Sequence, residues 1–342
     1  MLVVHHPDQA LHDPVHVFRN GKFIDQPDRA ERYHIFLSIM VEGGHQIVEA
    51  PLGSLDPITA IHHPDYVEFL QTVYDRWSAT PGYGPDVIPN VHPTHRMHRK
   101  PKELLGELGW YSNSTSCPIQ RGTWPAVFAS AQSAIHAADR LGDSNGLVYA
   151  LCRPPGHHAY TDLMSGVCFL NNAAIAANRL VGRFGKVAII DIDVHHGNGT
   201  QSIFWNRADV LVCSVHVDPT VAAPYYTGYA DETGDGPGKN LTLNLPLPLG
   251  AQNPEWVAAI DRAVAAVAHY QPGALVISLG FDASKYDPVA ALNVTDEGFS
   301  AAAGRLAKLG LPTLVVQEGG YINANLRMHM ATFFRAFEAA PK

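Results

Sequence analysis

The sequence predicts an α/β protein with three layers, in which a parallel, twisted sheet is covered by helices on both faces. Short, continuously apolar segments alternate with longer segments of helical spacing, as is typical of a parallel sheet buried on both faces. Most of the apolar segments also end in polar or reactive residues, as strands do where an open sheet binds a ligand. We expect the 342 residues to form a single catalytic domain, 1–342, with a long insertion loop at about 79–122.

The composition is that of a globular chain, with 46% hydrophobic and 16% charged residues. The net charge of -8, from 24 basic and 32 acidic residues, argues against nucleic acid as a partner and favours cationic ligands. The sequence has no apolar run of about 18 residues, as a membrane span would need, and its start lacks the pattern of a signal peptide. Four cysteines are widely spaced, which indicates reduced thiols and a cytoplasmic location: Cys117, Cys152, Cys168 and Cys213.

The regular elements are predicted in the second part of the chain, where apolar runs and helical periodicity alternate. Apolar runs of strand length lie at 146–152, 186–194, 209–215, 274–280 and 313–317. Segments of helical spacing lie at 124–141, 171–181, 254–270 and 295–310, and a last helix is expected from about 322. Helices thus lie between most of these strands and would return the chain to the start of the next parallel strand.

The segment 79–122 differs from the rest, because it is rich in Pro, Gly, His and basic residues and has little periodicity. We interpret it as an excursion from the domain that caps a site near the cleft or makes a subunit contact; a mobile surface loop is the alternative. Its His92, His95 and His98 resemble a metal cluster in spacing, but we favour a solvated or subunit-contact loop.

Reactive residues follow five of the predicted strands. They are Arg153–His158, Asp193 with His195, His216, Phe281 with Asp282, and Glu318–Tyr321. The carboxyl ends of parallel strands meet at one edge of a sheet, and ligands bind at this edge in open α/β sheets. This convergence predicts an enzyme.

The segment AIIDIDVHHGNGT, at 188–200, predicts a metal site at the end of a buried strand. On a strand, Asp191, Asp193 and His195 share one face, and buried carboxylates are costly unless they are paired or bind a metal. Asp193 and His195 can reach one cation, with Asp282 on a neighbouring strand end as the natural third ligand. Two carboxylates and one imidazole suit Zn²⁺ with an open position, although Fe²⁺ or another divalent ion also fits. A solvated turn is the alternative interpretation of this motif alone.

The tandem histidines and the tyrosine supply the remaining chemistry. His157 and His158 follow the stiff turn RPPG and can act as general base and general acid for a water and a departing amine. Gly319 and Gly320 give the backbone freedom to present Tyr321, whose phenol can donate to a carbonyl oxygen as it becomes an oxyanion.

Four of these motifs, RPPGHHA, DIDVHHGNGT, SLGFDAS and EGGY, resemble the histone deacetylase superfamily, whose members are zinc amide hydrolases on the arginase/deacetylase fold. The resemblance covers about 120–325, with the motifs in the right order. The runs CRPPGHHA, CFLNNAAIAA and GYADETG are most similar to the acetylpolyamine amidohydrolase branch, as is the insertion, which in that branch helps to form a dimer and narrows the cleft.

The resemblance implies a role for each residue of the site. It implies one Zn²⁺ on Asp193, His195 and Asp282, His157 and His158 as the acid/base pair, and Tyr321 as the group that polarises the carbonyl. It places Asp191 behind His157 and Asn198 behind His158, where some relatives have Asp. It further implies a structural K⁺, held by residues that overlap the zinc site: Asp191, Asp193, His195, Ser214 and Val215.

The same comparison predicts a substrate tunnel that departs from the usual pattern of the family. Its lining is expected to include Gly166, Val167, Ala223, Tyr225 and Ser116. Val167 and Ala223 match positions that are usually aromatic, and Ser116 matches an acidic residue that meets the distal amine in the polyamine branch. A wider tunnel without that acid weakens the case for long polyamines.

The sequence therefore predicts a zinc-dependent amidohydrolase that releases acetate from small N-acetylated amines, such as acetylpolyamines or acetylated diamines. The alternative substrates are other small amides, either acyl-lysine or xenobiotic N-alkyl amides. We expect a cytoplasmic homodimer or higher homo-oligomer, with neither nucleic acid nor membrane as a partner. A binuclear manganese ureohydrolase would need further Asp and His ligands, and a catalytically silent binder would lack Tyr321 or the histidine pair.

Overall fold

The computed structural model describes residues 1–92, 98–142, 146–289 and 291–340. Its centre is an eight-stranded sheet with the strand order β4-β1-β5-β10-β9-β6-β7-β8, in which every pairing is parallel. The strands are β1 (Leu2–His5), β4 (Gln46–Glu49), β5 (Leu147–Ala150), β6 (Val187–Asp191), β7 (Val210–Val217), β8 (Thr242–Leu247), β9 (Ala274–Leu279) and β10 (Thr313–Gln317). The predicted fold class, a parallel sheet within an α/β protein, is confirmed.

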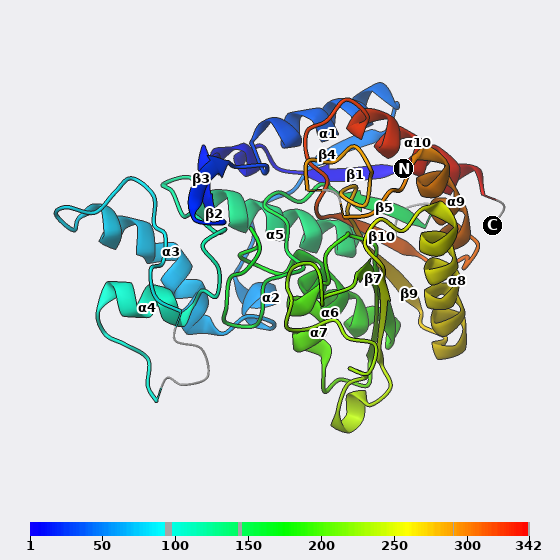
Figure 1. The fold of residues 1–342 in the computed structure, drawn as a ribbon. Helices are drawn as coiled ribbons and strands as arrows, with labels where there is room; N and C mark the ends of the chain where they lie inside the picture. The colour runs from blue at the N-terminus through cyan, green and yellow to red at the C-terminus, as the bar shows by residue number, and fades with distance from the viewer. Residues whose placement is uncertain (93–97, 143–145, 290, 341–342) are drawn as a thin grey trace.

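Helices cover both faces of this sheet (Figure 1), and each face has its own buried apolar cluster. One cluster includes side chains of α2 (Asp56–Thr59), α3 (Pro64–Ser78), α4 (Leu104–Trp110), α5 (Thr123–Arg140), α6 (Asn172–Phe184) and α7 (Asn198–Phe204). The other includes side chains of α1 (Glu31–Glu42), α8 (Asn253–Tyr270), α9 (Asp296–Ala307) and α10 (Leu326–Ala339). The sheet therefore lies as a middle layer between two layers of helices.

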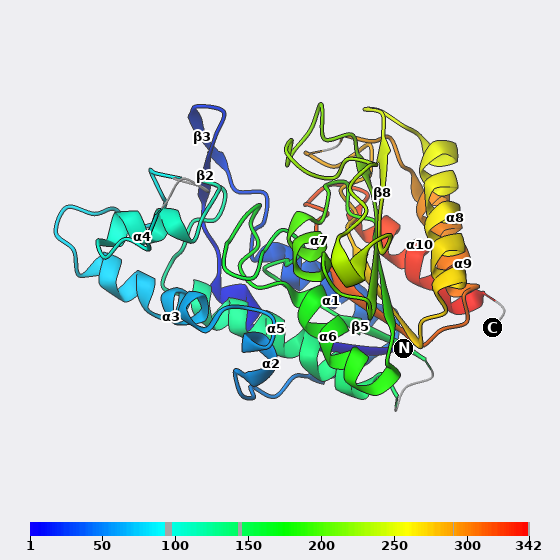
Figure 2. The same ribbon diagram turned by 90° about the horizontal axis from the view of Figure 1, so that it is seen from below.

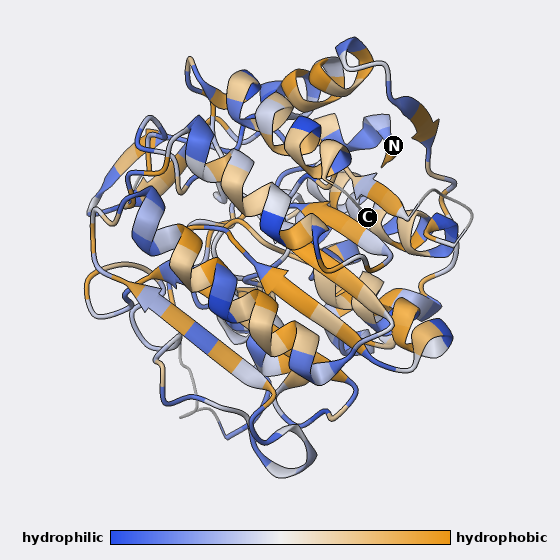
Figure 3. Ribbon diagram, turned by 90° about the vertical axis from the view of Figure 1, so that its right-hand side faces the viewer, coloured by the Kyte–Doolittle hydropathy of each residue, from blue (hydrophilic) through white to orange (hydrophobic). Residues whose placement is uncertain are grey.

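The central strands are buried on both faces because they are apolar along almost their whole length. All residues of β6, β7, β9 and β10 are buried. In Figure 3 the strands inside the molecule are mostly orange, whereas the helices in front of them alternate between orange and blue. Polar residues cap the first turns of two helices: Asn171 accepts a hydrogen bond from the backbone N–H of Ala174 at the start of α6, and Gln252 and Glu255 form a capping box at the start of α8.

The chain also contains elements that the apolar pattern did not predict, most of them in its first third. They include β1, β4, β8 and a separate antiparallel hairpin of β2 (His16–Arg19) and β3 (Lys22–Asp25). Figure 2 shows the hairpin standing away from the sheet, on the side where α3 and α4 lie. None of the helices in the described part of the chain has the length and apolar character that crossing a membrane requires.

The insertion at 79–122 is mostly irregular in its described residues and contains the single helix α4. Residues 93–97, and with them His95, lie outside the described residues. His92 contacts the carbonyl oxygen of Ser112 through its Nδ1 at 2.8 Å, within the insertion itself. The single-domain organisation stays a prediction.

Candidate active site

The sequence-predicted site residues meet at the carboxyl ends of four strands that are neighbours in the sheet, β5, β10, β9 and β6. β6 ends at Asp191, so Asp193 and His195 lie in the segment after the strand. The prediction that they lie on the strand and share one face with Asp191 is therefore wrong. β9 leads to Asp282 and β10 leads to Tyr321. The parallel register thus brings together residues that are more than one hundred positions apart in the chain.

Asp193, His195 and Asp282 form a compact group whose potential ligand atoms all lie within 4.8 Å of one another. Nδ1 of His195 lies 3.2 Å from Oδ1 of Asp193 and 3.2 Å from Oδ2 of Asp282. Ligand atoms in a tetrahedral zinc site with bonds of about 2.0–2.2 Å are separated by roughly 3.3 Å. The spacing and the donor set therefore fit a divalent ion such as Zn²⁺.

Backbone groups hold the two carboxylates in this arrangement. The N–H of Gly319 donates to Oδ2 of Asp193 at 2.8 Å, and the N–H of Val194 donates to Oδ1 of Asp282 at 3.0 Å. A Cβ on Gly319 would lie 2.4 Å from Oδ2 of Asp282 and 2.5 Å from Oδ2 of Asp193. The carboxylates can approach the backbone in this way only because residue 319 is a glycine.

The electrostatics of the group also favour a cation. Burial raises the pKa of Asp282 to about 7, and the carboxylate of Asp193 adds to this effect. Burial alone would lower the pKa of His195, but its contacts with Asp193 and Asp282 outweigh burial and raise the pKa to about 9. The two buried carboxylates thus repel each other, and the positive charge of a bound divalent ion would offset this repulsion.

The two histidines lie beside this group and each is oriented by a different partner. Nδ1 of His157 lies 3.0 Å from Oδ2 of Asp191, and Nδ1 of His158 lies 2.5 Å from Oδ1 of Asn198. The centres of the two rings are 4.0 Å apart. Because both Nδ1 atoms are occupied, Nε2 is the nitrogen that each ring can offer to a substrate.

The partners shift the two histidine pKa values in opposite directions. Burial would lower the pKa of His157, but the carboxylates of Asp193 and Asp191 outweigh it and raise the pKa well above its ordinary value. Burial and the positive charges of His157 and His195 lower the pKa of His158 well below its ordinary value, against a smaller opposing effect of Asn198. The chain therefore holds one ring that favours the protonated form and one that favours the neutral form.

Tyr321 is held in place by Asp287 and Arg32, two residues that lie outside every motif of the sequence. Its backbone N–H donates to Oδ2 of Asp287 at 2.7 Å, and the guanidinium of Arg32 lies 4.8 Å from the centre of its ring. Arg32 belongs to α1, far from the motifs, and is fully buried with Asp28 and Arg153. No local pattern marks Arg32, which stands at the end of the charged run 28–32.

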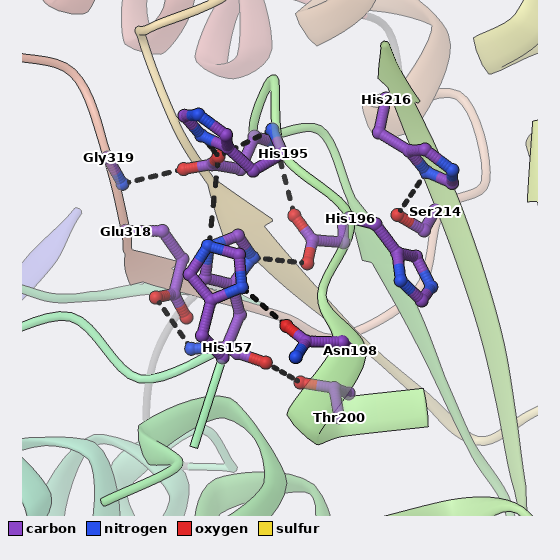
Figure 4. Close-up of polar contacts among 12 residues, drawn as sticks. His157, His195, His196, Asn198, Thr200, Ser214, His216, Glu318 and Gly319 are labelled. Atoms are coloured by element: carbon purple, nitrogen blue, oxygen red, sulfur yellow. Dashed lines mark hydrogen bonds and ion pairs between the residues drawn. The ribbon is translucent and has the colours of Figure 1, made fainter. Parts of the chain in front are cut away.

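Glu318 joins the site to the turn that carries the histidines. Its Oε2 accepts hydrogen bonds from the N–H groups of Gly156 at 2.7 Å and His157 at 3.1 Å. Figure 4 shows Glu318 and His157 with this second contact dashed. Burial raises the pKa of Glu318 to about 7. The sequence placed Glu318 at a strand end but assigned it no role, and the structure identifies it as the residue that fixes the start of the histidine pair.

The residues predicted for a potassium site are adjacent, on β6 and β7. Asp191 pairs in register with Ser214, and Val215 follows in β7. Oγ of Ser214 contacts Nδ1 of His216 at 2.8 Å, and Oδ1 of Asp191 accepts the N–H of Asp193 at 3.1 Å. The potassium site stays a prediction.

One cavity of about 370 Å³ opens onto the histidines, Tyr321 and the three proposed metal ligands. All five residues predicted for the tunnel line it: Gly166, Val167, Ala223, Tyr225 and Ser116. The lining also includes residues that the sequence analysis missed, Phe18, Arg19, Asn20, Gln26 and Val289. Asn20-Gly21 is a two-residue hairpin signature in the sequence and would have revealed the hairpin, although not its place beside the cavity.

Comparison with known proteins finds similar sequences that span most or all of the chain. The model of the histone deacetylase domain matches residues 25–337. Acetylpolyamine amidohydrolase 1 of Pseudomonas aeruginosa is 39% identical over all of both chains, and acetylpolyamine amidohydrolase of Burkholderia pseudomallei is 40% identical over 99% of each. Acetylpolyamine amidohydrolase of Mycoplana ramosa is 36% identical over 98% of this chain and 99% of its own.

A solved structure is also similar. The crystal structure of acetylpolyamine aminohydrolase from Burkholderia pseudomallei superimposes with a TM-score of 0.96, at 39% identity and with 99% of each chain covered. This match extends the confirmation of the fold from the central sheet to the layers of helices around it.

Proposed function

The chain belongs to the histone deacetylase family and is a deacetylase-type amidohydrolase, and we propose that it uses zinc to hydrolyse small N-acetylated amines. One observation carries the proposal: the triad of proposed metal ligands Asp193, His195 and Asp282, the histidine pair and Tyr321 all line the same cavity. A zinc ion held by the triad would polarise the amide carbonyl and make water a better nucleophile.

In the proposed reaction the histidine pair takes one proton from the attacking water and gives one proton to the departing nitrogen, so its total number of protons is unchanged after each turnover. His158, whose Nδ1 faces the amide of Asn198, is the ring better kept neutral, so we assign it the uptake of the water proton. His157 is backed by the carboxylate of Asp191, which stabilises its protonated form and suits it to donate to the amine. The carbon–nitrogen bond breaks, and the products are a free amine and acetate or another small acid.

Tyr321 stabilises the oxyanion in this proposal. Its hydroxyl donates a hydrogen bond to the carbonyl oxygen as negative charge develops there. Asp287 holds the backbone of Tyr321 and Arg32 lies over its ring, so the phenol is positioned before the substrate arrives.

For the substrate we take acetylated polyamines and diamines first, because the full-length relatives are named as acetylpolyamine amidohydrolases. A second class, other small amides, is supported by the lining of the cavity. Val167 and Ala223 line the cavity at the positions that the resemblance matches to aromatic residues of the family, so the cavity offers less contact to a straight methylene chain. The cytoplasmic location, the homo-oligomeric state and the structural K⁺ stay predictions.

The test is to measure amine release from acetylputrescine, acetylcadaverine, an acetyl-lysine peptide and a neutral N-alkyl acetamide, with elemental analysis of the same protein. We expect turnover of at least one amide by protein that holds one zinc per chain. Tyr321→Phe should lower turnover by about 100- to 1,000-fold at full zinc content. Tyr270→Phe is the matched control, because its hydroxyl contacts the carbonyl oxygen of Ala208, outside the cavity lining.

Full activity of metal-free protein, or inactivity of the zinc-loaded protein on all four amides, would overturn the proposal. Two metal ions per chain would instead favour the ureohydrolase alternative.

A further inference from the structure

The outer wall of the cavity is built by two segments far apart in the sequence. The β2–β3 hairpin supplies Phe18, Arg19 and Asn20, and residues 114–116 supply the wall beside them. The hydroxyl of Thr115 donates to the carbonyl oxygen of Phe18 at 2.8 Å, which ties the two segments together. The cavity mouth is therefore a defined surface and not only a gap between loops.

The turn of the hairpin fixes where Arg19 lies. Asn20 and Gly21 have φ values of 53° and 76°, the left-handed pair that a tight two-residue turn between antiparallel strands requires. Arg19 is the last residue of β2 and pairs in register with Lys22 across this turn. The position of the Arg19 backbone at the mouth is thus set by a short turn.

Arg19 gives the mouth a positive charge that no described carboxylate neutralises. The carboxylates in the lining of the cavity are Asp193 and Asp282, both of which we assign to the metal. Among the described residues, no ion pair joins Arg19 to an acid, and Asp25 at the other end of the hairpin lies nearest His16, at 4.0 Å. Apart from the histidines and the two aspartates, the polar residues that share the lining with Arg19 are neutral: Asn20, Gln26, Ser114, Thr115, Ser116, Tyr225 and Tyr321.

We infer that Arg19 is a specificity-determining residue, which disfavours substrates with a distal ammonium and favours N-acylated amines whose far end is a carboxylate. This inference rests on the proposed amide hydrolysis but changes the order of its substrates, because it places acetylated diamines below N-acylated amines with a distal carboxylate. A guanidinium in a lining that also carries hydroxyl and amide groups offers donors suited to a carboxylate. A cationic tail would meet a like charge there, with no carboxylate of the described lining free to accept it.

The test uses three acetamides with one shared spacer: acetylputrescine, its alcohol analogue and its carboxylate analogue. We expect kcat/KM to be highest for the carboxylate and lowest for the ammonium compound. For a solvent-exposed charge such as Arg19, each step should be roughly threefold to tenfold. Added salt should reduce these ratios, because exposed charges are screened.

Variants at the mouth separate Arg19 from the general charge of the hairpin. Arg19→Gln should make the kcat/KM values of the three compounds similar, and Arg19→Glu should reverse the order of these values. Lys22→Gln is the matched control, because Lys22 carries the same charge on the paired strand but does not line the cavity. Its ratios should stay as in the wild type.

Preference of the wild type for acetylputrescine, or ratios that are the same in Arg19→Glu, would overturn the inference while leaving amide hydrolysis intact. Failure to hydrolyse any of the three compounds would count against the proposed function instead. In that case calorimetry on Tyr321→Phe still tests the inference, because the binding affinities of the three compounds show whether the carboxylate, the alcohol or the ammonium end is preferred.

Discussion

Nε of Arg32 donates a hydrogen bond to the carbonyl oxygen of Gly320 at 2.7 Å, and so a residue of the first helix holds the peptide that precedes Tyr321. The same guanidinium donates from Nη2 to the carbonyl oxygen of Glu318 at 2.8 Å. Arg32 thereby fixes both sides of the glycine pair that carries Tyr321. A segment remote from every motif controls the position of the proposed oxyanion donor.

Replacing Arg32 with Met should reduce both stability and turnover. The variant leaves Asp28 with Arg153 as its remaining partner, and breaking a buried ion pair costs about 3 kcal/mol or more in free energy of unfolding. The loosened Tyr321 should lower kcat by roughly tenfold to 100-fold. KM should change little, because a misplaced donor weakens the stabilisation of the transition state and not the binding of the substrate.

Urea unfolding and steady-state kinetics on soluble, folded protein check this prediction. Arg29→Gln is the control, since Arg29 is in the same region and pairs with Asp13 at the surface, away from Tyr321. A kcat that stays at the wild-type value in Arg32→Met would show that Tyr321 needs no support from α1.

Gly319→Ala should abolish metal binding without unfolding the rest of the domain. The added Cβ would overlap the carboxylate oxygens of Asp193 and Asp282, so the proposed ligands could not keep their positions. Elemental analysis should find much less zinc in the variant, and circular dichroism should show retained secondary structure. Gly182→Ala, on α6 with open space around it, should bind zinc normally and gain up to about 1 kcal/mol in stability. Full zinc occupancy in Gly319→Ala would contradict the assigned ligand set.

The central part of the fold was predictable because its strands are buried on both faces. The continuous apolar run at 187–190, and the equivalent runs of β7, β9 and β10, carry the signal of a parallel sheet in their own composition. The residues that follow these strands could be located for the same reason, because the register of a parallel sheet brings strand ends together. The roles assigned to them rest on chemistry and on the family resemblance.

The rest of the site depends on contacts that leave no local trace in the sequence. β1 and β4 are only four residues each, too short to show a period. Arg32 and Asp287 act through backbone groups of the Tyr321 loop, and Arg19 reaches the cavity only because the hairpin packs beside residues 114–116. Such long-range contacts become visible only in three dimensions.

Glu318 should make the stability of the protein depend on pH in a direction unusual for a carboxylate. Its pKa is raised by burial from 4.5 to about 7, so the folded state binds a proton that the unfolded state releases. This contribution to stability is therefore lost as the pH rises from about 4.5 to about 7, and it amounts to roughly 3 kcal/mol. Oε1 of Glu318, which has no hydrogen-bond partner among the described residues, is the natural place for the proton.

Glu318→Gln keeps an acceptor for Gly156 and His157 and removes the titration. The difference in free energy of unfolding between Glu318→Gln and the wild type should change in favour of the variant as the pH rises through this range. Denaturant unfolding at several pH values measures it. Glu68→Gln, at an exposed acid of α3, should show no comparable trend. A difference that does not vary with pH would mean that Glu318 is ionised throughout.

Asn198→Asp should shift the acid limb of the pH profile of kcat/KM to higher pH. Burial and neighbouring positive charge keep the pKa of His158 low, and a carboxylate in place of the Asn198 amide would stabilise its protonated form. Because the proposed base must be neutral to accept the water proton, more of it would be inactive at a given low pH. Asn178→Asp, beside Arg207 and away from the cavity, is the matched control and should leave the profile unchanged. An acid limb at the same pH in Asn198→Asp would transfer the role of base from His158 to His157, whose own partner Asp191 is unaltered in this variant.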